Sequence, residues 1–156
     1  LDRLLITHLK GTWNCCQAAA IHMVEAKYGR ILNCSSFAAL IPQAGSAAYS
    51  ASKAAIIALT RALAGELAPY NILVNCYVPG TFDTRASQHS TVLRREDALN
   101  AMSLRRFGRP EEMGPLVAFL VSPLNSFMNG SIVDINGGKL AIQNPAKPWR
   151  DAGMID

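Results

Sequence analysis

Apolar residues recur along the first part of the chain at helical intervals. The positions are Leu5, Leu9, Trp13, Cys16, Ala20 and Met23. Steps of three and four residues place all of them on one face of a helix. The pattern therefore predicts a long first helix that ends at Tyr28-Gly29, with Gly29 as a left-handed cap.

Short apolar runs follow, and each is bounded by turn-forming residues. Residues 30–34, 72–78 and 131–135 are predicted to be buried strands. An alanine-rich helix is predicted over residues 48–68, and another begins near residues 110–112 and ends near 122–123. Long helices that alternate with short apolar strands predict an α/β fold, with a parallel sheet covered on both faces.

The remaining segments are predicted to be irregular. A loop of small residues spans 35–47, and a polar stretch from 81 to 108 has the composition of a flap with a short helix near 91–102. A tail from residue 139 carries Pro145 and Pro148 and has no clear period. We expect residues 1–138 to form one catalytic unit and residues 139–156 a C-terminal tail that is either packed on a neighbouring subunit or disordered.

Composition and charge narrow the possible functions. Half of the 156 residues are hydrophobic and 17% are charged, which excludes a disordered chain. No apolar run approaches the ~18 residues that a membrane span needs. The formal net charge is +4, and arginines stand in short pairs at 94–95 and 105–106, so we expect no nucleic-acid partner.

The four cysteines, Cys15, Cys16, Cys34 and Cys76, all lie in apolar segments, and none forms a C-x-x-C pair. This arrangement makes a zinc site improbable and predicts reduced, buried thiols in a cytoplasmic protein, without a metal. The N-terminus shows no basic leader followed by an apolar block, so no secretory signal is expected.

The candidate chemistry centres on Tyr49 and Lys53, which share a helix face at a spacing of four. An ordinary phenol ionises only near pH ~10, and a neighbouring ammonium favours its ionised form. Ser36 follows the first strand, where open parallel sheets bind ligands, and could hold a substrate oxygen facing Tyr49. Taken singly, the Tyr-Lys pair could be a solvated surface pair, and Ser36 could be a loop-capping serine.

A second group of residues lies just past the next strand. Pro79-Gly80 stops this strand, and Thr84 follows four residues later, within reach of the same crevice. An ordinary turn would explain Pro79-Gly80 equally well if it stood alone.

Together these residues resemble the short-chain dehydrogenase/reductase family, over nearly the whole chain up to about residue 138. The matching residues are Ser36, residues 49–55 (YSASKAA), Val74-Asn75, Pro79-Gly80 with Thr84, Arg106-Phe107-Gly108 with Pro110-Glu111-Glu112, and Asp134 with Gly137-Gly138. The resemblance implies a Rossmann-type three-layer αβα fold and hydride transfer between NAD or NADP and an alcohol or carbonyl substrate. An epimerase or dehydratase on the same fold is less well matched by these motifs.

The resemblance also implies a role for each residue. Tyr49 would be the acid/base, Lys53 its modifier and a ribose ligand, and Ser36 the anchor of the substrate oxygen. Pro79, Gly80, the Phe82 main chain and Thr84 would hold the nicotinamide amide. Residues 85–106 would form the substrate flap. Residues 3–27 and 48–68 would pack against their copies in a homodimer or homotetramer, with an intramolecular contact of these helices as the alternative.

His8 stands where the family has a catalytic Asn that holds a water next to the lysine. An imidazole can also donate to and accept from water, so His8 could serve a proton relay, or it could be a structural or solvent-facing histidine. The H-L-K-G setting of residues 8–11 is similar to the hydroxyacyl-CoA dehydrogenase branch. That similarity faintly supports a 3-hydroxyacyl or 3-oxoacyl thioester as substrate.

The chain has no glycine-rich turn of the dinucleotide-binding type. By the resemblance, roughly a hundred residues are missing before Leu1, and about three of the family's seven strands remain. We therefore expect this fragment alone to be poorly soluble or partly unfolded, inactive and unable to bind dinucleotide, because the edge of residues 31–34 and both long helices lack cover. A different hypothesis is a naturally truncated, non-catalytic oligomerisation module.

Overall fold

The structure is a computed structural model, which describes residues 1–42, 44–85, 87 and 95–156. Three strands form its sheet: β1 (Gly29–Cys34), β2 (Ile72–Pro79) and β3 (Ile132–Ile135). They are parallel and lie in the order β1-β2-β3, with Ile31 opposite Val74 and Cys76 opposite Ile132. The predicted parallel α/β sheet of Rossmann type is confirmed.

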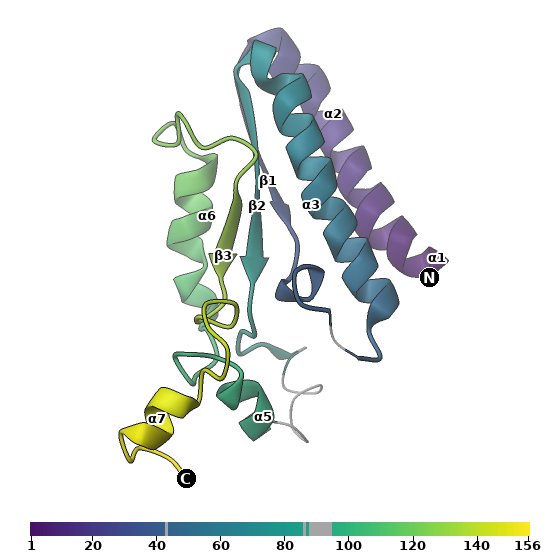
Figure 1. Ribbon diagram of the computed structural model, residues 1–156. Coiled ribbons are helices and arrows are strands. Elements are labelled where there is room, and N and C mark those ends of the chain that lie inside the picture. The colour runs from purple at the N-terminus through teal and green to yellow at the C-terminus, as the bar shows by residue number, and fades with distance from the viewer. Residues whose placement is uncertain (43, 86, 88–94) are drawn as a thin grey trace.

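Helices cover both faces of the sheet (Figure 1). On one face lie α2 (Gly11–Ala26) and α3 (Ala47–Leu67), and on the other lies α6 (Gly114–Val121). Short elements complete the chain: α1 (Asp2–Leu4), the π-helical turn η1 (Leu5–Lys10), the 3₁₀ turns η2 (Phe37–Ala39), η3 (Ala68–Tyr70) and η5 (Pro110–Glu112), α5 (Arg95–Asn100) and α7 (Lys147–Asp151). The predicted short helix near 91–102 is described only from Arg95 onward, since residues 91–94 lie outside the described residues.

The core lies between the sheet and the α2–α3 layer. Ile72 and Val74 of β2 are fully buried against Leu63 and Ala64 of α3 and Cys16 of α2. Burial of this apolar surface away from water is the main contribution to the stability of the layer.

A small polar cluster crosses the same layer. The buried Asn33 side chain donates to Thr60 Oγ1 at 3.0 Å and accepts from Cys16 Sγ at 3.4 Å. Thr60 in turn donates to the carbonyl of Ile56 at 2.8 Å. Because each of these buried groups is satisfied, they fix how β1 lies against α2 and α3 instead of weakening the core.

The first helix ends differently from the sequence prediction. The left-handed residue is Lys27, with φ of 49°, and not Gly29, which already begins β1. A glycine suits position 29 for another reason: a Cβ there would lie 2.4 Å from Met23 Sδ. The glycine therefore allows the end of α2 to approach the start of β1, and the cap prediction was wrong by two residues.

Some apolar side chains of the N-terminal helical segment remain exposed to solvent. Trp13 is 42% exposed and Ile21 is 66% exposed, whereas Cys16 is buried. A groove of about 490 Å³ lies along the first part of this segment, lined by Leu5, Ile6, Leu9, Lys10, Trp13 and Leu59. Among the described residues, no helix is long and apolar enough to cross a membrane.

The cysteines divide into two groups. Cys16 and Cys76 are buried, but Cys15 and Cys34 are exposed, so the prediction that all four are buried was wrong. Neighbouring positions on a strand or helix point in different directions, and an apolar run alone does not show which of them faces solvent. All four thiols are free.

The C-terminal tail packs on the body of the same chain. Ala146 is 3% exposed, and the indole Nε1 of Trp149 in α7 donates to the carbonyl of Ser103 at 2.8 Å. The tail thereby lies beside the segment that follows α5 (Figure 1). From the sequence we expect packing on a neighbouring subunit or disorder, and neither alternative includes packing on the same chain. Proline residues and a missing period do not show which surface a tail contacts.

Candidate functional site

A cleft of about 600 Å³ lies at the carboxyl ends of β1 and β2. Its walls are Cys34, Ser36, Phe37, Tyr49, Tyr77, Pro79, Gly80, Thr81, Phe82, Thr84, Ser87, Pro110 and Met113. Six of the residues predicted for the site from the sequence line this one cleft: Ser36, Tyr49, Pro79, Gly80, Phe82 and Thr84. The loops after parallel strands gather at one edge of the sheet, which explains how residues this far apart meet.

Tyr49 and Lys53 lie in the first turns of α3. The Lys53 ammonium is 6.0 Å from the centroid of the Tyr49 ring and donates to the carbonyl of Cys34 at 3.2 Å. The main-chain carbonyl of Lys53 accepts from Ser35 Oγ at 2.8 Å. Two contacts thus tie this turn of α3 to the end of β1, so the lysine is held beside the tyrosine.

Ser36 is buried just past the carboxyl end of β1 and is the N-cap residue of the turn η2. Its Oγ accepts a hydrogen bond from the Ala38 N–H at 3.2 Å. This is the capping contact that the sequence allowed as the alternative to a binding role. A hydroxyl has one proton and two lone pairs, so the cap uses only acceptor capacity and leaves the proton for another oxygen.

His8 contacts the site from behind Tyr49. Its Nδ1 is 2.9 Å from Ser52 Oγ, and its ring meets the Tyr49 ring edge-to-face at a centroid distance of 5.6 Å. The Ser52 hydroxyl gives its single proton to the Tyr49 carbonyl at 2.7 Å. Ser52 Oγ can therefore only accept from His8, which places the proton of the neutral imidazole on Nδ1 and leaves Nε2 as an acceptor.

The surroundings of His8 favour this neutral form. Burial lowers the pKa of His8 below its ordinary 6.5, and the positive charge of Lys53 lowers it further. At neutral pH the side chain is therefore uncharged, with one nitrogen committed to Ser52 and the other free to accept.

Gly80 follows β2 at a point where two backbone segments nearly touch. A Cβ at this position would lie 2.7 Å from Asn136 Cα and 2.8 Å from the Asn136 carbonyl oxygen. The Gly80 N–H donates to the carbonyl of Ile135 at 3.0 Å. The glycine therefore allows the chain to run beside the end of β3 before it enters the cleft wall.

The cleft wall beyond Gly80 is braced against a second loop. Phe82 and Gly108 form a parallel bridge, in which Asp83 N donates to Gly108 O at 2.8 Å and Gly108 N to Thr81 O at 3.0 Å. A Cβ on Gly108 would lie 2.6 Å from the Phe82 ring. The absence of a side chain at Gly108 therefore lets the Phe82 ring pack closely against this loop.

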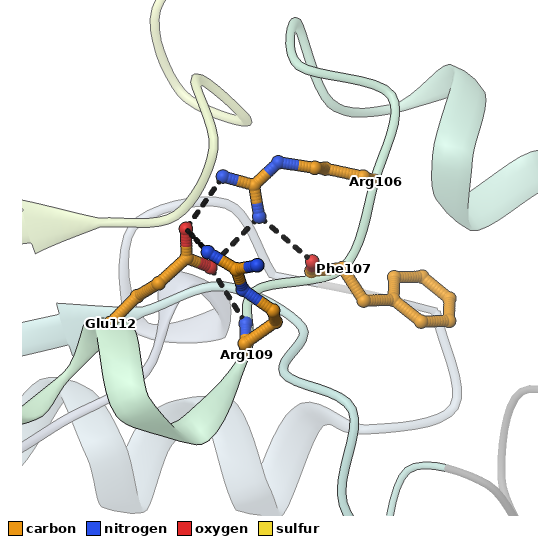
Figure 2. A network of polar contacts seen from close by, with 4 residues as sticks. All are labelled: Arg106, Phe107, Arg109 and Glu112. Atoms are coloured by element: carbon orange, nitrogen blue, oxygen red, sulfur yellow. Dashed lines mark hydrogen bonds and ion pairs between the residues drawn. The ribbon is translucent and has the colours of Figure 1, made fainter.

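A carboxylate network holds the same loop at the start of η5 (Figure 2). Arg106 donates through both terminal nitrogens to Glu112, at 2.8 and 2.7 Å. The Arg109 N–H also donates to Glu112, at 2.8 Å. These contacts give the Arg-Phe-Gly and Pro-Glu-Glu motif a structural role: it fixes the loop that carries Gly108 against Phe82.

The network makes a testable contribution to stability. Arg106, and then the Arg109 N–H, hold the pKa of Glu112 at about 2, below its ordinary 4.5. The unfolded chain takes up this proton near pH 4.5 and the folded chain only near pH 2, so the contribution is present above 4.5 and is lost as pH falls through 2. We expect Glu112→Gln to destabilise the protein at pH 6 but progressively less below pH ~4.

Chemical denaturation at a series of pH values measures this difference. Glu111→Gln removes a carboxylate one position away and is the control, expected to show little effect. Since the Glu112 network is exposed, added salt should reduce its contribution. An effect of Glu112→Gln that is as large at pH 2 as at pH 6 would contradict the ion-pair explanation.

Several contacting groups were not predicted from the sequence. Ser52 lies inside the matched motif, but only the structure shows that it bridges His8 and the Tyr49 backbone. The Cys34 carbonyl that accepts from Lys53 has no side-chain signal at all. Tyr77 also lines the cleft, and burial raises the pKa of its phenol well above the ordinary value, so it remains a neutral wall residue.

Comparison with known proteins gives a consistent result. The family described as enoyl-(acyl carrier protein) reductase matches residues 1–139. The 3-oxoacyl-[acyl-carrier-protein] reductase FabG of Thermotoga maritima is 36% identical over 137 residues, covering 88% of this chain and 56% of that protein.

Solved structures show the same fold. An NAD⁺-bound xylitol dehydrogenase superposes with a TM-score of 0.83 at 33% identity, over 88% of this chain and 58% of that one. A gluconate 5-dehydrogenase of Burkholderia cenocepacia, in complex with NADP and tartrate, has a TM-score of 0.84 at 28% identity, over 87% and 54%. The chain thus spans little more than half the length of the proteins it matches, and it belongs to the short-chain dehydrogenase/reductase family.

Proposed function

We propose that this chain carries the proton-transfer centre of an NAD- or NADP-dependent oxidoreductase that acts on a secondary alcohol or ketone. The observation that carries the proposal is the convergence of Ser36, Tyr49 and Thr84 on one cleft, with Lys53 held beside Tyr49. Relatives whose names describe reductases and dehydrogenases support the same reaction class. A 3-oxoacyl or 3-hydroxyacyl thioester is one candidate substrate, in line with the FabG relative.

The cleft suits the nicotinamide end of a dinucleotide. The described residues of its wall include no Asp or Glu, and they combine apolar side chains with the hydroxyls of Ser36, Tyr49 and Thr84. Pro79, Gly80, Phe82 and Thr84 would hold the carboxamide, and Tyr49 and Lys53 the adjoining ribose. The sequence contains no glycine-rich turn for the pyrophosphate. The xylitol dehydrogenase structure holds NAD⁺ and the gluconate 5-dehydrogenase structure holds NADP, so either cofactor is compatible with this fold.

The residues of the cleft would divide the chemistry among them. A bound nicotinamide supplies or accepts the hydride. During reduction the Tyr49 hydroxyl donates its proton to the substrate oxygen, and the Ser36 hydroxyl donates a hydrogen bond to the same oxygen. Lys53 brings positive charge beside Tyr49 as negative charge develops there. Oxidation reverses each of these transfers.

His8 extends the path of the proton behind Tyr49. Its Nδ1–H is committed to Ser52, and its Nε2 would accept from a water near Lys53. An asparagine could reproduce both contacts, with its amide N–H toward Ser52 and its carbonyl oxygen toward the water. Because an aliphatic side chain can reproduce neither, the two substitutions separate a relay from a packing role.

We expect His8→Asn to keep kcat within a few-fold of wild type and His8→Leu to lower kcat about tenfold or more, with a smaller change in KM. Steady-state rates of the full-length gene product across a pH series measure both effects. His22→Leu, at an exposed position of α2, is the matched control. Total loss of activity in His8→Asn would count against the relay.

Transfer of deuterium tests the reaction itself. The full-length gene product is incubated with a ketone and with NADH or NADPH deuterated on one face of the nicotinamide ring. We expect one deuterium in the product alcohol from one face only, because a nicotinamide ring bound in one orientation would present a single face to the ketone. Absence of transfer with either cofactor, across ketones and 3-oxoacyl thioesters, would overturn the proposal.

A second candidate function rests on the groove along Trp13 and Leu9. Its exposed apolar lining suits a protein partner, and we propose a homodimer or homotetramer through residues 3–27 and 48–68. Without catalysis, this surface alone would make the chain an oligomerisation module. Light scattering of the gene product, with Trp13→Glu as the variant, distinguishes an assembly from a monomer.

A further inference from the structure

Lys139 is placed beside the cleft by a tight turn after β3. Gly137 and Gly138 adopt φ of 64° and 76°, left-handed values that glycine accommodates readily. The Lys139 N–H then donates to Asn136, through both the main-chain oxygen at 3.3 Å and Oδ1 at 3.1 Å. The Gly138 carbonyl accepts from Ser103 Oγ at 3.0 Å. These contacts fix the backbone from which the lysine side chain extends.

The ammonium of Lys139 lies over an aromatic wall of the cleft. Its Nζ is 4.1 Å from the centroid of the Phe37 ring, a cation–π distance. Phe37 lines the cleft and directly follows Ser36 in the chain. The Phe37 ring therefore contacts the Lys139 ammonium and also lines the cleft in which a substrate oxygen would meet Ser36 and Tyr49.

This charge has no counterion among the described residues. Lys147 pairs with Asp151 at 2.5 Å and Arg106 pairs with Glu112, but no described carboxylate pairs with Lys139. The lysine is half-buried, and burial lowers its pKa. No Asp or Glu occurs among the described residues that line the cleft. A partly desolvated ammonium without a carboxylate partner gains more from an incoming anion than a fully hydrated one does.

We propose that Lys139 determines substrate specificity by binding an anionic oxygen group, a carboxylate or a phosphate, several bonds away from the reacting carbonyl. This inference rests on the proposed oxidoreductase function and adds a substrate class to it. Phe37 keeps the lysine in place through its ring face, and the anion neutralises the charge. The competing explanation is that Lys139 only supports the packing of Phe37, in which case the charge of the substrate is irrelevant.

Matched substrates separate the two explanations in the full-length gene product. Acetoacetate and methyl acetoacetate present the same ketone with and without a carboxylate, and dihydroxyacetone phosphate and dihydroxyacetone do so for a phosphate. We expect Lys139→Met to lower kcat/KM about tenfold to a hundredfold for one of the two anions and at most about threefold for its neutral partner. Lys139→Arg should retain the preference, and Lys147→Met is the control at an exposed ion pair.

A binding measurement makes the test independent of turnover. The amine of Lys139 is acetylated in the presence of each anion or its neutral partner, from both the acetoacetate and the dihydroxyacetone phosphate pair. The labelled peptides are quantified by mass spectrometry, with Lys147 as internal reference. Protection of Lys139 by an anion but not by its neutral partner supports the inference, even if no ketone is reduced. If no carbonyl compound is reduced by wild type, the proposed function fails, and protection alone decides the role of Lys139. Losses in Lys139→Met that are equal for each anion and its neutral partner, in both the carboxylate and the phosphate pair, would overturn the inference, as would the absence of selective protection by either anion.

Discussion

Replacing Tyr49 by Phe is expected to lower kcat by about three orders of magnitude, while dinucleotide affinity falls at most severalfold through the loss of one ribose contact. The substitution removes one hydroxyl group and keeps the ring, so the edge-to-face contact with His8 and the wall of the cleft remain. Among the described residues, no hydrogen bond involves this hydroxyl, so its loss leaves no buried partner unsatisfied. A large fall in kcat would therefore report proton transfer and not damage to the fold.

The measurement compares steady-state turnover with cofactor titration in the full-length gene product. Tyr70→Phe removes a phenol from an exposed position and should leave kcat unchanged. If Tyr49→Phe keeps a substantial part of its activity, another group transfers the proton and the proposed role of Tyr49 is wrong. If turnover and cofactor affinity fall together, the hydroxyl serves binding more than chemistry.

The positions of Tyr49, Lys53 and Ser36 in the fold could be predicted from the sequence, because each is set by a pattern among nearby residues. The four-residue spacing of Tyr49 and Lys53 fixes their common helix face, and the apolar run before Ser36 fixes the strand end. Both signals depend on local geometry that tertiary contacts seldom change. The order of elements and the parallel sheet followed from the same reasoning, and the structure confirms them.

Other features depend on contacts between distant segments, which no local pattern carries. The contact of His8 with Ser52 joins residues 44 positions apart. The ammonium of Lys139 reaches Phe37 from a turn after the last strand. Gly29 illustrates the same limit: its position after a helix suggested a cap, but its actual constraint is the Met23 side chain packed against it.

The second large effect is expected from Gly80→Ala, which should lower the free energy of unfolding by about 3 kcal/mol or more. The added Cβ would meet the Cα, carbonyl carbon and carbonyl oxygen of Asn136, at 2.7, 3.0 and 2.8 Å. These are backbone atoms, so no side-chain rotation can relieve the clash, and the end of β2 must move away from the end of β3. That movement would also displace the cleft wall at Pro79 and Phe82, so turnover should fall with stability.

Gly65→Ala is the matched control because it makes the same chemical change with the opposite expected sign. Gly65 lies in the last turn of α3, and nothing stands within 4 Å of a Cβ built there. Alanine should therefore stabilise the helix by about 0.5–1 kcal/mol. Urea unfolding of both variants, compared at unchanged slope, measures the difference. A Gly80→Ala variant as stable as wild type would show that the two strand ends can separate without cost, and the close approach of Gly80 to Asn136 would then not be what requires a glycine at this turn.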